Sequence, residues 1–281
     1  MSTPERDLVH LSYSSLQDYQ DCPRRFQLRY ILEQPWPAVQ SEPLLEHERY
    51  AELGRRFHRL VEQHLAGLPV ATLTASIAEE ELARWWRHYL NVPPADVLGL
   101  PLRRAELALS APLSTPGGTY RLMARYDLLA IAPGERAFIV DWKTERRRPT
   151  RPQLAGRMQT RVYRYVLVEA GQTLNAGRPL EPENVSMVYW FAEFPAEPEV
   201  FSYDSAQHAA AAAALSTLLA EIATRTDDVF PLTADARHCR YCVYRSLCER
   251  GVEAEMSAVG EEENETETIE FDWTSIEEVA Y

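Results

Sequence analysis

The most informative part of the sequence is "GGTYRLMARYDLLAIAPGERAFIVDWKT", residues 117–144. Apolar, β-branched and aromatic residues lie on both sides of Pro133-Gly134, a pair typical of turns, so the stretch predicts two β-strands joined by that turn. Side chains two residues apart on a strand share a face. Asp141 and Lys143 should therefore project together, with Trp142 on the opposite face.

The charged end of this stretch suggests a metal site. Asp127 closes the first strand, "YRLMARYD", and its carboxylate can approach that of Asp141 if the two strands are hairpin neighbours. Adjacent carboxylates repel each other, and a hard cation that prefers oxygen ligands, such as Mg²⁺ or Mn²⁺, relieves that repulsion. Such an ion can lower the pKa of a water aimed at phosphorus, and a nearby ammonium can stabilise the developing charge.

Lys143 is the only lysine of the chain, which otherwise uses arginine. Lysine is a compact point charge that can exchange a proton when buried, whereas the broad guanidinium of arginine stays charged. This difference favours a functional lysine over the alternative, a surface salt bridge that happens to use lysine. The D-x-K motif is weak by itself, so its neighbours matter.

Apolar residues at helical spacing predict helices on both sides of these strands. Helices are expected within residues 11–32, 43–67, 75–90, 152–171 and 205–225, and further strands within residues 103–113, 183–194 and 199–204. A cysteine-bearing segment follows at residues 236–251. This order predicts an α/β core with an N-terminal helical lobe.

The composition indicates a globular body and a separate acidic tail. The chain has 281 residues, 46% of them apolar, and a net charge of −13. Residues 251–281 contain 11 acidic residues and no basic ones, which leaves residues 1–250 at −2. We therefore expect one domain over residues 1–250 and a solvated, disordered tail over residues 251–281. A sharper alternative is that the tail mimics nucleic-acid charge or docks a partner through "IEFDW".

The sequence also restricts location and partners. It has no apolar run of about 18 residues that could span a membrane. The first ten residues lack the apolar segment of a secretion signal, so a cytoplasmic protein is expected. The nucleotide-binding motif G-x-x-x-x-G-K-[ST] does not occur, so any ATP-driven helicase would have to be a partner.

Four short motifs lie in order along the chain. They are Gly54 and His58 in "GRRFH", Asp127 in "ARYD", Asp141 and Lys143 in "DWK", and Gln159 and Tyr163 in "QTRVY". Together they resemble the RecB-like branch of the PD-(D/E)xK nucleases, over nearly all of residues 10–250. This branch includes the nuclease domains of recombination helicase-nucleases and the four-cysteine CRISPR-associated exonucleases. One departure is Ala124, which replaces the glycine usual before the aspartate.

The resemblance implies a restriction-endonuclease-like core, in which helices flank a central mixed sheet. It implies a DNA nuclease acting on single strands or ends, in repair, recombination or CRISPR adaptation. His58, Asp127 and Asp141 would hold Mg²⁺ or Mn²⁺, and Lys143 would activate or orient the water. Gln159 and Tyr163 would support the substrate. Glu106 could assist as an acid behind the ligands, although a structural role is favoured. The alternative function is a non-catalytic DNA-binding or scaffolding module.

The cysteines form a separate pattern. Cys239, Cys242 and Cys248 follow C-x2-C-x5-C, and Cys22 lies far upstream before a proline. Disulfides are rare in cytosolic proteins, and four thiolates can bind zinc or an iron-sulfur cluster. This arrangement resembles the iron-sulfur staple of the same nuclease branch. We therefore favour a [4Fe-4S] cluster that ties the two ends of the domain together, with zinc as the alternative.

Clustered arginines predict contacts with the DNA backbone. Seven of them lie between residues 146 and 164, directly after the active strand, and three more surround His58. Clustered cations bind phosphates without reading sequence. The candidates for DNA contact are Arg55, Arg146, Arg147, Arg148 and Arg161. A solvated helix face is the alternative.

Overall fold

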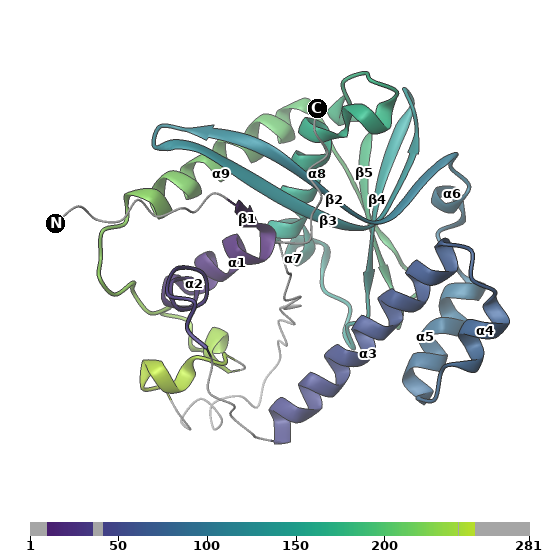
Figure 1. Cartoon of the computed structure of the whole chain (residues 1–281), viewed down its shortest axis with the longest axis horizontal. Coiled ribbons are helices and arrows are strands. Elements are labelled where there is room, and N and C mark those ends of the chain that lie inside the picture. The colour runs from purple at the N-terminus through teal and green to yellow at the C-terminus, as the bar shows by residue number, and fades with distance from the viewer. Residues whose placement is uncertain (1–9, 36–41, 241, 251–281) are drawn as a thin grey trace.

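The computed structural model describes residues 10–35, 42–240 and 242–250 (Figure 1). Its centre is a hairpin of two long antiparallel strands, β2 (Leu102–Thr115) and β3 (Gly118–Ala132), followed by β4 (Arg136–Lys143). The turn between β3 and β4 contains Gly134, whose φ of 82° is a conformation that favours glycine. The turn predicted at Pro133-Gly134 is therefore confirmed.

The strands form one mixed sheet in the order β1-β3-β4-β5-β6, with β2 paired to β3. On the edge of β3 away from β2, β1 (His10–Ser12) pairs in parallel and β4 pairs antiparallel further along. Next come β5 (Val185–Phe191), parallel to β4, and the short β6 (Glu199–Ser202), antiparallel to β5. The strand at residues 199–204 was predicted as such a partner.

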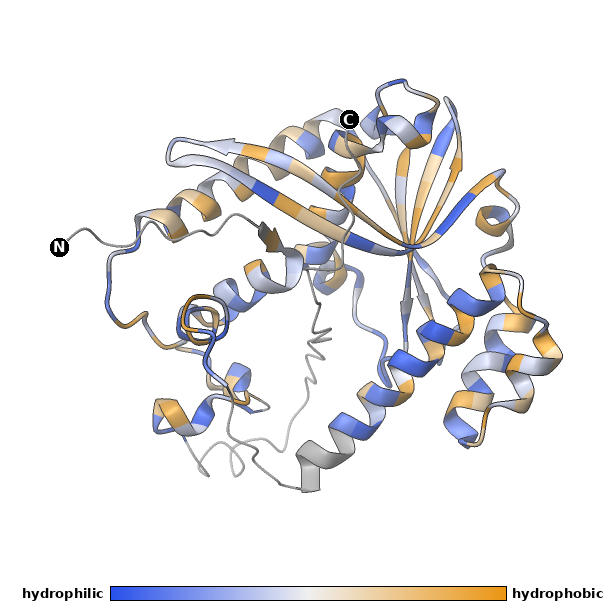
Figure 2. Ribbon diagram, viewed as in Figure 1, coloured by the Kyte–Doolittle hydropathy of each residue, from blue (hydrophilic) through white to orange (hydrophobic). Residues whose placement is uncertain are grey.

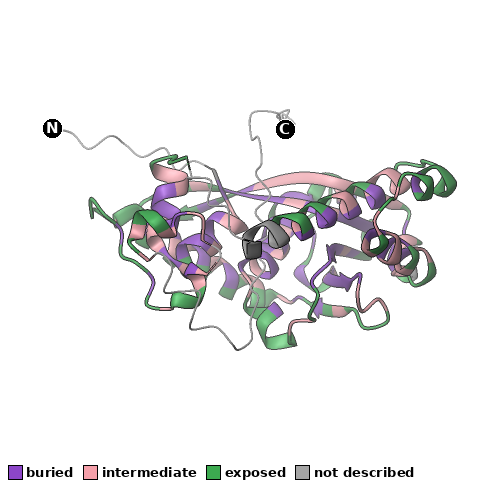
Figure 3. Ribbon diagram, turned by 90° about the horizontal axis from the view of Figure 1, so that it is seen from below, coloured by how far each residue is buried: buried purple, intermediate pink, exposed green. Residues whose placement is uncertain are grey.

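Helices cover both faces of the sheet, as the expected fold class requires. One face packs against α1 (Tyr13–Asp21), α8 (Met158–Ala170) and α9 (Ser205–Thr224). The other packs against α3 (Glu42–Leu65) and α5 (Glu80–Asn91), with the short α4 (Val70–Ala75) and α6 (Ala95–Leu98) beside them. Figure 2 shows hydrophilic and apolar residues alternating along α3, as in an amphipathic helix. In Figure 3 the exposed residues gather on helices and loops.

Two stretches predicted as continuous helices are interrupted, and a third helix begins later than predicted. The residue before a proline avoids helical backbone, and Cys22 is accordingly extended, with a ψ of 103°. It separates α1 from α2 (Pro23–Phe26) and a π-helical turn (Gln27–Ile31). Arg157, with a ψ of 138°, separates α7 (Arg151–Gly156) from α8. The helix predicted over residues 75–90 begins only at Glu80, after α4 has ended at Ala75.

Asp127 does not close its strand as predicted, because β3 continues to Ala132. It lies instead where β2 and β3 change face. Tyr126 belongs to the core beneath α8 and Leu128 to the core beneath α3, although side chains two apart on a regular strand share a face. Opposite Asp127 in the register, Glu106 has a φ of 52°, in the left-handed region. The two strands are therefore kinked at this pair of acids.

The C-terminal segment returns to the N-terminal helices. The remaining elements are 3₁₀ turns at Gly171–Asn175, Pro182–Asn184, Ala236–Cys239 and Arg245–Cys248. The Gln27 side chain donates to the Asp228 carbonyl and accepts from the Phe230 N–H, each at 2.9 Å. In Figure 1 the last, yellow turns lie beside α1 and α2.

Two predictions concern parts of the chain or properties outside this core. The acidic tail, residues 251–281, lies outside the described residues. Within residues 10–35, 42–240 and 242–250, no helix combines the length and apolar character that crossing a membrane requires.

Candidate active site

Two charged residues at the end of β4 form a buried ion pair. Lys143 Nζ lies 3.0 Å from Asp141 Oδ2, and the two residues are 4% and 2% exposed. The Gln159 amide on α8 donates a hydrogen bond to Asp141 Oδ1 at 2.6 Å. Trp142 lies on the other face, in the aromatic core beside α3 and α5. The predicted alternation of these three strand residues is confirmed, and Gln159 is buried against the carboxylate.

Asp127 lies beside this pair, where β3 and β4 part. Regular pairing between the two strands ends at Leu128 and Val140. One residue further, Asp127 Oδ2 accepts a hydrogen bond from the Trp142 N–H at 2.8 Å. Asp127 Oδ1 lies 3.4 Å from His58 Nδ1 on α3. The Asp127 carboxylate thus accepts the hydrogen bond that a backbone carbonyl would otherwise accept from Trp142 on β4. Through His58 it also connects β4 to α3.

Gly54 lets α3 approach β4 closely enough to place His58. A Cβ atom at Gly54 would lie 2.9 Å from Thr144 Oγ1, closer than Cβ atoms come to their neighbours in real proteins. From the same helix, the Tyr50 hydroxyl donates to the Thr144 carbonyl at 2.8 Å. His58 follows Gly54 by about one helical turn and so lies on the same side of α3. The G-x-x-x-H motif therefore combines a packing position with a candidate ligand position.

Glu106 is the site residue that sequence reasoning undervalued. One ligand atom each of His58, Glu106 and Asp127 lies within 4.8 Å of the others, a group that could hold a metal ion. Glu106 also accepts a hydrogen bond from Arg125 Nε at 2.6 Å. Burial and the nearby Asp127 carboxylate raise the pKa of Glu106 to about 7. The only signal in the sequence was an acid within the otherwise apolar "AELAL".

The donor atoms of this group fit a divalent cation. Burial raises the pKa of Asp127, but His58, the Trp142 N–H and Lys143 outweigh it and bring the pKa below its ordinary value. Asp127 is therefore a carboxylate at neutral pH, and a bound cation would favour the same form of Glu106. One imidazole nitrogen and two carboxylates suit Mn²⁺ and Mg²⁺.

Asp141 was predicted as a third ligand beside His58 and Asp127. Among the described residues it does not belong to the group within 4.8 Å, in which Glu106 holds the third place. Its oxygens contact Gln159 and Lys143 instead. In the structure Asp141 is therefore held by Gln159 and Lys143.

Tyr163, predicted to support the substrate, is buried in α8. Its ring packs edge-on against Tyr13, with centroids 5.3 Å apart, and its backbone carbonyl accepts from the Tyr126 hydroxyl at 2.9 Å. Burial raises the pKa of Tyr163 well above its ordinary value, and Tyr13 and Asp141 raise it further. The phenol therefore stays protonated and packs within the core.

The predicted DNA-contacting arginines lie on α3, on α8 and in the loop after β4. All of them are exposed or half-buried: Arg55, Arg146, Arg147, Arg148 and Arg161. Arg146 lies over the ring of Tyr50, with its guanidinium carbon 4.3 Å from the centroid, in a cation–π contact. Arg148 is paired with Glu199 at 2.5 Å. Contact of these side chains with DNA stays a prediction.

The four cysteines gather where the N- and C-terminal segments meet. Cys22 and Cys239 are buried, and Cys242 and Cys248 are partly exposed. Burial raises the pKa of the Cys242 thiol to about 11, and the neighbouring Cys22 and Cys239 add to this effect. Burial also raises the pKa of Cys248, with contributions from the same two neighbours. The thiols of Cys242 and Cys248 therefore each lie near those of Cys22 and Cys239.

The match to a family model defines the class of this protein. The model described as "PD-(D/E)XK nuclease superfamily" matches residues 10–249. The chain therefore belongs to the PD-(D/E)XK nuclease superfamily. The resemblance stated from the motifs is confirmed at this level.

The chain is similar to a number of solved structures, of which two serve as examples. The protein SSO0001 is 13% identical, with 90% of this chain and 89% of that chain covered and a TM-score of 0.42. The "Putative exonuclease" of Eubacterium rectale is 8% identical, with 79% and 85% covered and a TM-score of 0.45. Both TM-scores are below 0.5, and no mechanistic conclusion is drawn from either likeness. No curated protein matches the chain.

Proposed function

We propose that this nuclease cleaves DNA with a divalent metal ion held by His58, Glu106 and Asp127. The observation that carries the proposal is the position of this group beside the buried Asp141–Lys143 pair. The two are connected by the hydrogen bond from the Trp142 N–H to Asp127. Mg²⁺ and Mn²⁺ both suit the donor set. When bound, the ion supplies a water of lowered pKa and offsets negative charge on the phosphate.

The residues of the chain orient this chemistry. Gln159 fixes one oxygen of Asp141, and the other oxygen holds the Lys143 ammonium at the end of β4. Lys143 orients the attacking water and stabilises the charge that develops on the phosphate oxygens. Because the pair is almost fully buried, the ammonium acts through a lower dielectric than that of bulk water.

Single-stranded DNA or a DNA end is the substrate we propose. The arginines after β4 would bind phosphates without reading sequence. The guanidinium of Arg146, stacked on Tyr50, offers a planar surface on which a base can stack. A helicase or other protein partner would supply the unwound strand. Repair, recombination and CRISPR adaptation, in the cytoplasm, are the settings that this chemistry fits.

We further propose that Cys22, Cys239, Cys242 and Cys248 bind a [4Fe-4S] cluster, with zinc as the alternative. Zinc holds four thiolates at about 2.3 Å in a tetrahedron, which separates the sulfur atoms by about 3.8 Å. The described cysteines do not form a group whose ligand atoms all lie within 4.8 Å of one another. This wider arrangement supports the larger cluster, which would join the two ends of a single domain over residues 1–250.

Lys143→Ala tests the proposed cleavage. We expect cleavage of labelled single-stranded DNA with Mg²⁺ or Mn²⁺ to fall by about a hundredfold or more, the range for loss of a proton-transferring or charge-stabilising group. DNA binding in chelator should stay unchanged. The thermal midpoint should fall, because the buried Asp141 carboxylate loses its counter-charge, so cleavage is compared at temperatures where the variant stays folded. Arg136→Ala, at the exposed start of the same strand, is the matched control and should keep full activity.

The outcomes separate the two functions considered. Undiminished cleavage by Lys143→Ala would refute the assignment of this residue. A wild-type protein that binds DNA but shows no metal-dependent cleavage would support the non-catalytic scaffold instead. Oligonucleotides blocked at the 5′ or the 3′ end then distinguish exonuclease from endonuclease and give the polarity.

A further inference from the structure

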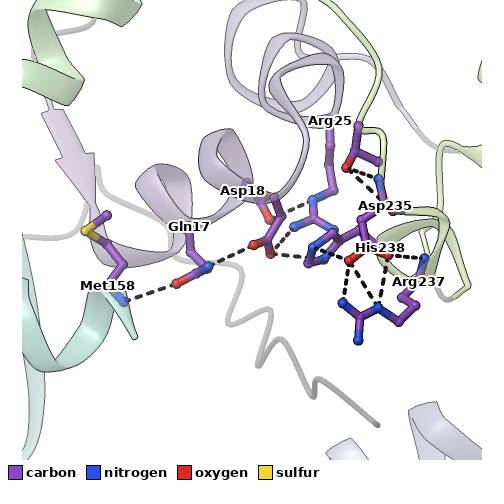
Figure 4. Close-up of polar contacts among 9 residues, drawn as sticks. Gln17, Asp18, Arg25, Met158, Asp235, Arg237 and His238 are labelled. Carbon is purple, nitrogen blue, oxygen red and sulfur yellow. Dashed lines mark hydrogen bonds and ion pairs between the residues drawn. The ribbon is translucent and has the colours of Figure 1, made fainter. Parts of the chain in front are cut away.

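A series of polar contacts joins the start of α8 to the C-terminal segment (Figure 4). The Met158 N–H donates to Gln17 Oε1 at 3.1 Å, and Gln17 Nε2 donates to Asp21 Oδ1 at 2.8 Å. The other oxygen of Asp21 accepts from Arg25 at 2.9 Å and lies 3.8 Å from His238 Nδ1. The contacts therefore lead from α8 through α1 to α2 and to the C-terminal segment.

Gln17 supplies a cap that α8 does not make for itself. Met158 is the first residue of α8, and its N-cap residue, Arg157, makes no side-chain capping hydrogen bond. The first N–H groups of a helix have no partner within the helix. For the Met158 N–H, the acceptor is the side-chain oxygen of Gln17 on α1, which lies 141 residues away in the chain. The position of α1 therefore fixes the start of α8.

The start of α8 is also where the active site is held. Gln159 follows Met158 directly, and its amide contacts Asp141 Oδ1 at 2.6 Å. The hydroxyl of the next residue, Thr160, forms a hydrogen bond with the Tyr189 hydroxyl on β5 at 2.6 Å. A shift of the first turn of α8 would therefore move the amide that orients the catalytic carboxylate.

The other end of these contacts lies among the cysteines. Asp21 precedes Cys22 directly, and His238 precedes Cys239. The side chains of Asp21 and Arg25 are 14% and 10% exposed, so their ion pair is shielded from solvent and is stronger than a surface pair. Gln17 thus connects the cysteine-bearing ends of the chain to the helix that orients Asp141.

We propose that Gln17 is a positioning residue for cleavage. Its hydrogen bond from the Met158 N–H fixes the first turn of α8, and so the position from which the Gln159 amide contacts Asp141. Its hydrogen bond to Asp21 couples that position to the junction of the N- and C-terminal segments. The inference rests on the proposed nuclease function. Gln17 acts through Gln159 and is assigned no contact with the substrate.

Gln17→Ala tests the inference through the split between kcat and KM. We expect kcat for metal-dependent cleavage to fall about tenfold or more, as when a partner behind a functional carboxylate is lost. The KM for DNA and the metal content of the cysteines should not change, since the arginines and thiols are untouched. Gln20→Ala, at an exposed glutamine of the same helix, should keep the wild-type kcat. A wild-type kcat in Gln17→Ala would overturn the inference.

An exchange of donor and acceptor provides a rescue. In the double variant Gln17→Glu with Asp21→Asn, the carboxylate at position 17 accepts from the Met158 N–H. The amide at position 21 donates to that carboxylate, and its oxygen still accepts from Arg25. The double variant should recover most of kcat. Gln17→Glu alone should not, because it sets two carboxylates against each other. A double variant as slow as Gln17→Ala would contradict the proposed role.

Hydrogen exchange gives a readout that does not need activity. In Gln17→Ala the amide of Met158 should exchange faster than in the wild type, because its acceptor is gone. Unchanged exchange there would refute the positioning role, whether or not the protein cuts DNA. Absence of metal-dependent cleavage by the wild type would instead refute the proposed function.

Discussion

At the scale of single residues, the site explains why a chain rich in arginine keeps one lysine. Lys143 is 4% exposed, with its ammonium 3.0 Å from Asp141 and 5.9 Å from the centroid of the Tyr189 ring. A guanidinium is wider and carries five N–H donors that burial would leave in need of acceptors. The buried position suits the compact ammonium, and the need for lysine's chemistry at this position stays a prediction.

Glu106 leads to a prediction about pH for the metal-free protein. Burial and the Asp127 carboxylate raise its pKa to about 7 from an ordinary value of 4.5. Between these values the folded protein keeps a proton on Glu106 that the unfolded chain has lost. The contribution of Glu106 to the free energy of unfolding therefore falls as pH rises from about 4.5 to about 7. Urea denaturation in chelator at several pH values measures the effect.

Glu106→Gln is the comparison that isolates this group, because glutamine does not titrate. The difference in the free energy of unfolding between wild type and variant should change across that pH range and level off below it. A difference independent of pH would contradict the raised pKa. Added Mn²⁺ should stabilise the wild type more than the variant, since the variant lacks a proposed ligand.

At the scale of elements, the site is assembled by local departures from regular structure. At the kink formed by Glu106 and Asp127, the alternate side chains of β2 and β3 switch from one face of the sheet to the other. The kink brings these two acids together, which regular alternation along a strand would not predict. The parting of β3 from β4 frees the Trp142 N–H for Asp127. The close approach of α3 at Gly54 then adds His58. Each element therefore contributes one of the groups that meet at the site.

Gly54→Ala tests the approach of α3 to β4. The added Cβ would lie 2.9 Å from Thr144 Oγ1, on a buried β-branched side chain that cannot move far. We expect the free energy of unfolding to fall by about 1–3 kcal/mol, as for overpacking in a core. Cleavage should fall as well, because His58 moves with the helix. Chemical denaturation and the nuclease assay measure the two effects.

Two companions to this variant make the test specific. Thr144→Ala removes the atom that Gly54→Ala meets, so the double variant should recover most of the lost stability. Gly156→Ala places a Cβ in open space and should cause no clash. Wild-type stability and activity in Gly54→Ala would contradict the steric account.

At the scale of the whole molecule, the two ends of the described chain close on each other beside the sheet. The Gln27 side chain holds Asp228 and Phe230, and the Tyr244 hydroxyl donates to the Gln34 carbonyl at 3.1 Å. The four cysteines lie at this junction. A cluster there would cross-link segments more than two hundred residues apart in the sequence.

Cys22→Ala tests that cross-link. We expect the free energy of unfolding to fall by about 2–5 kcal/mol, the range for losing a cross-link between distant segments. Stability should suffer more than the chemistry at temperatures where the variant stays folded. The wild type purified without oxygen should be brown and contain about four iron and four sulfide per chain. Ser246→Ala, an exposed change in the same segment, should keep them. A colourless protein with stoichiometric zinc would overturn the cluster.

Local sequence patterns were enough to predict the strands on either side of Pro133-Gly134, the shared face of Asp141 and Lys143, and membership of the superfamily. These features were predictable because alternation with period two and short motifs are properties of neighbouring residues. The longer helices were predictable for the same reason, apart from the interruptions at Cys22 and Arg157 and the late start at Glu80. The short helices α4 and α6 were not predicted.

Two features of the site became visible only in the folded chain: Glu106 joins His58 and Asp127, and Gln17 caps α8. The first depends on a kink shared by two paired strands, which breaks the alternation from which a face is predicted. The second depends on two helices, 141 residues apart, that meet through the packing of the whole core. Such contacts leave no periodic trace in the sequence, because the residues that make them are neighbours only after the chain has folded.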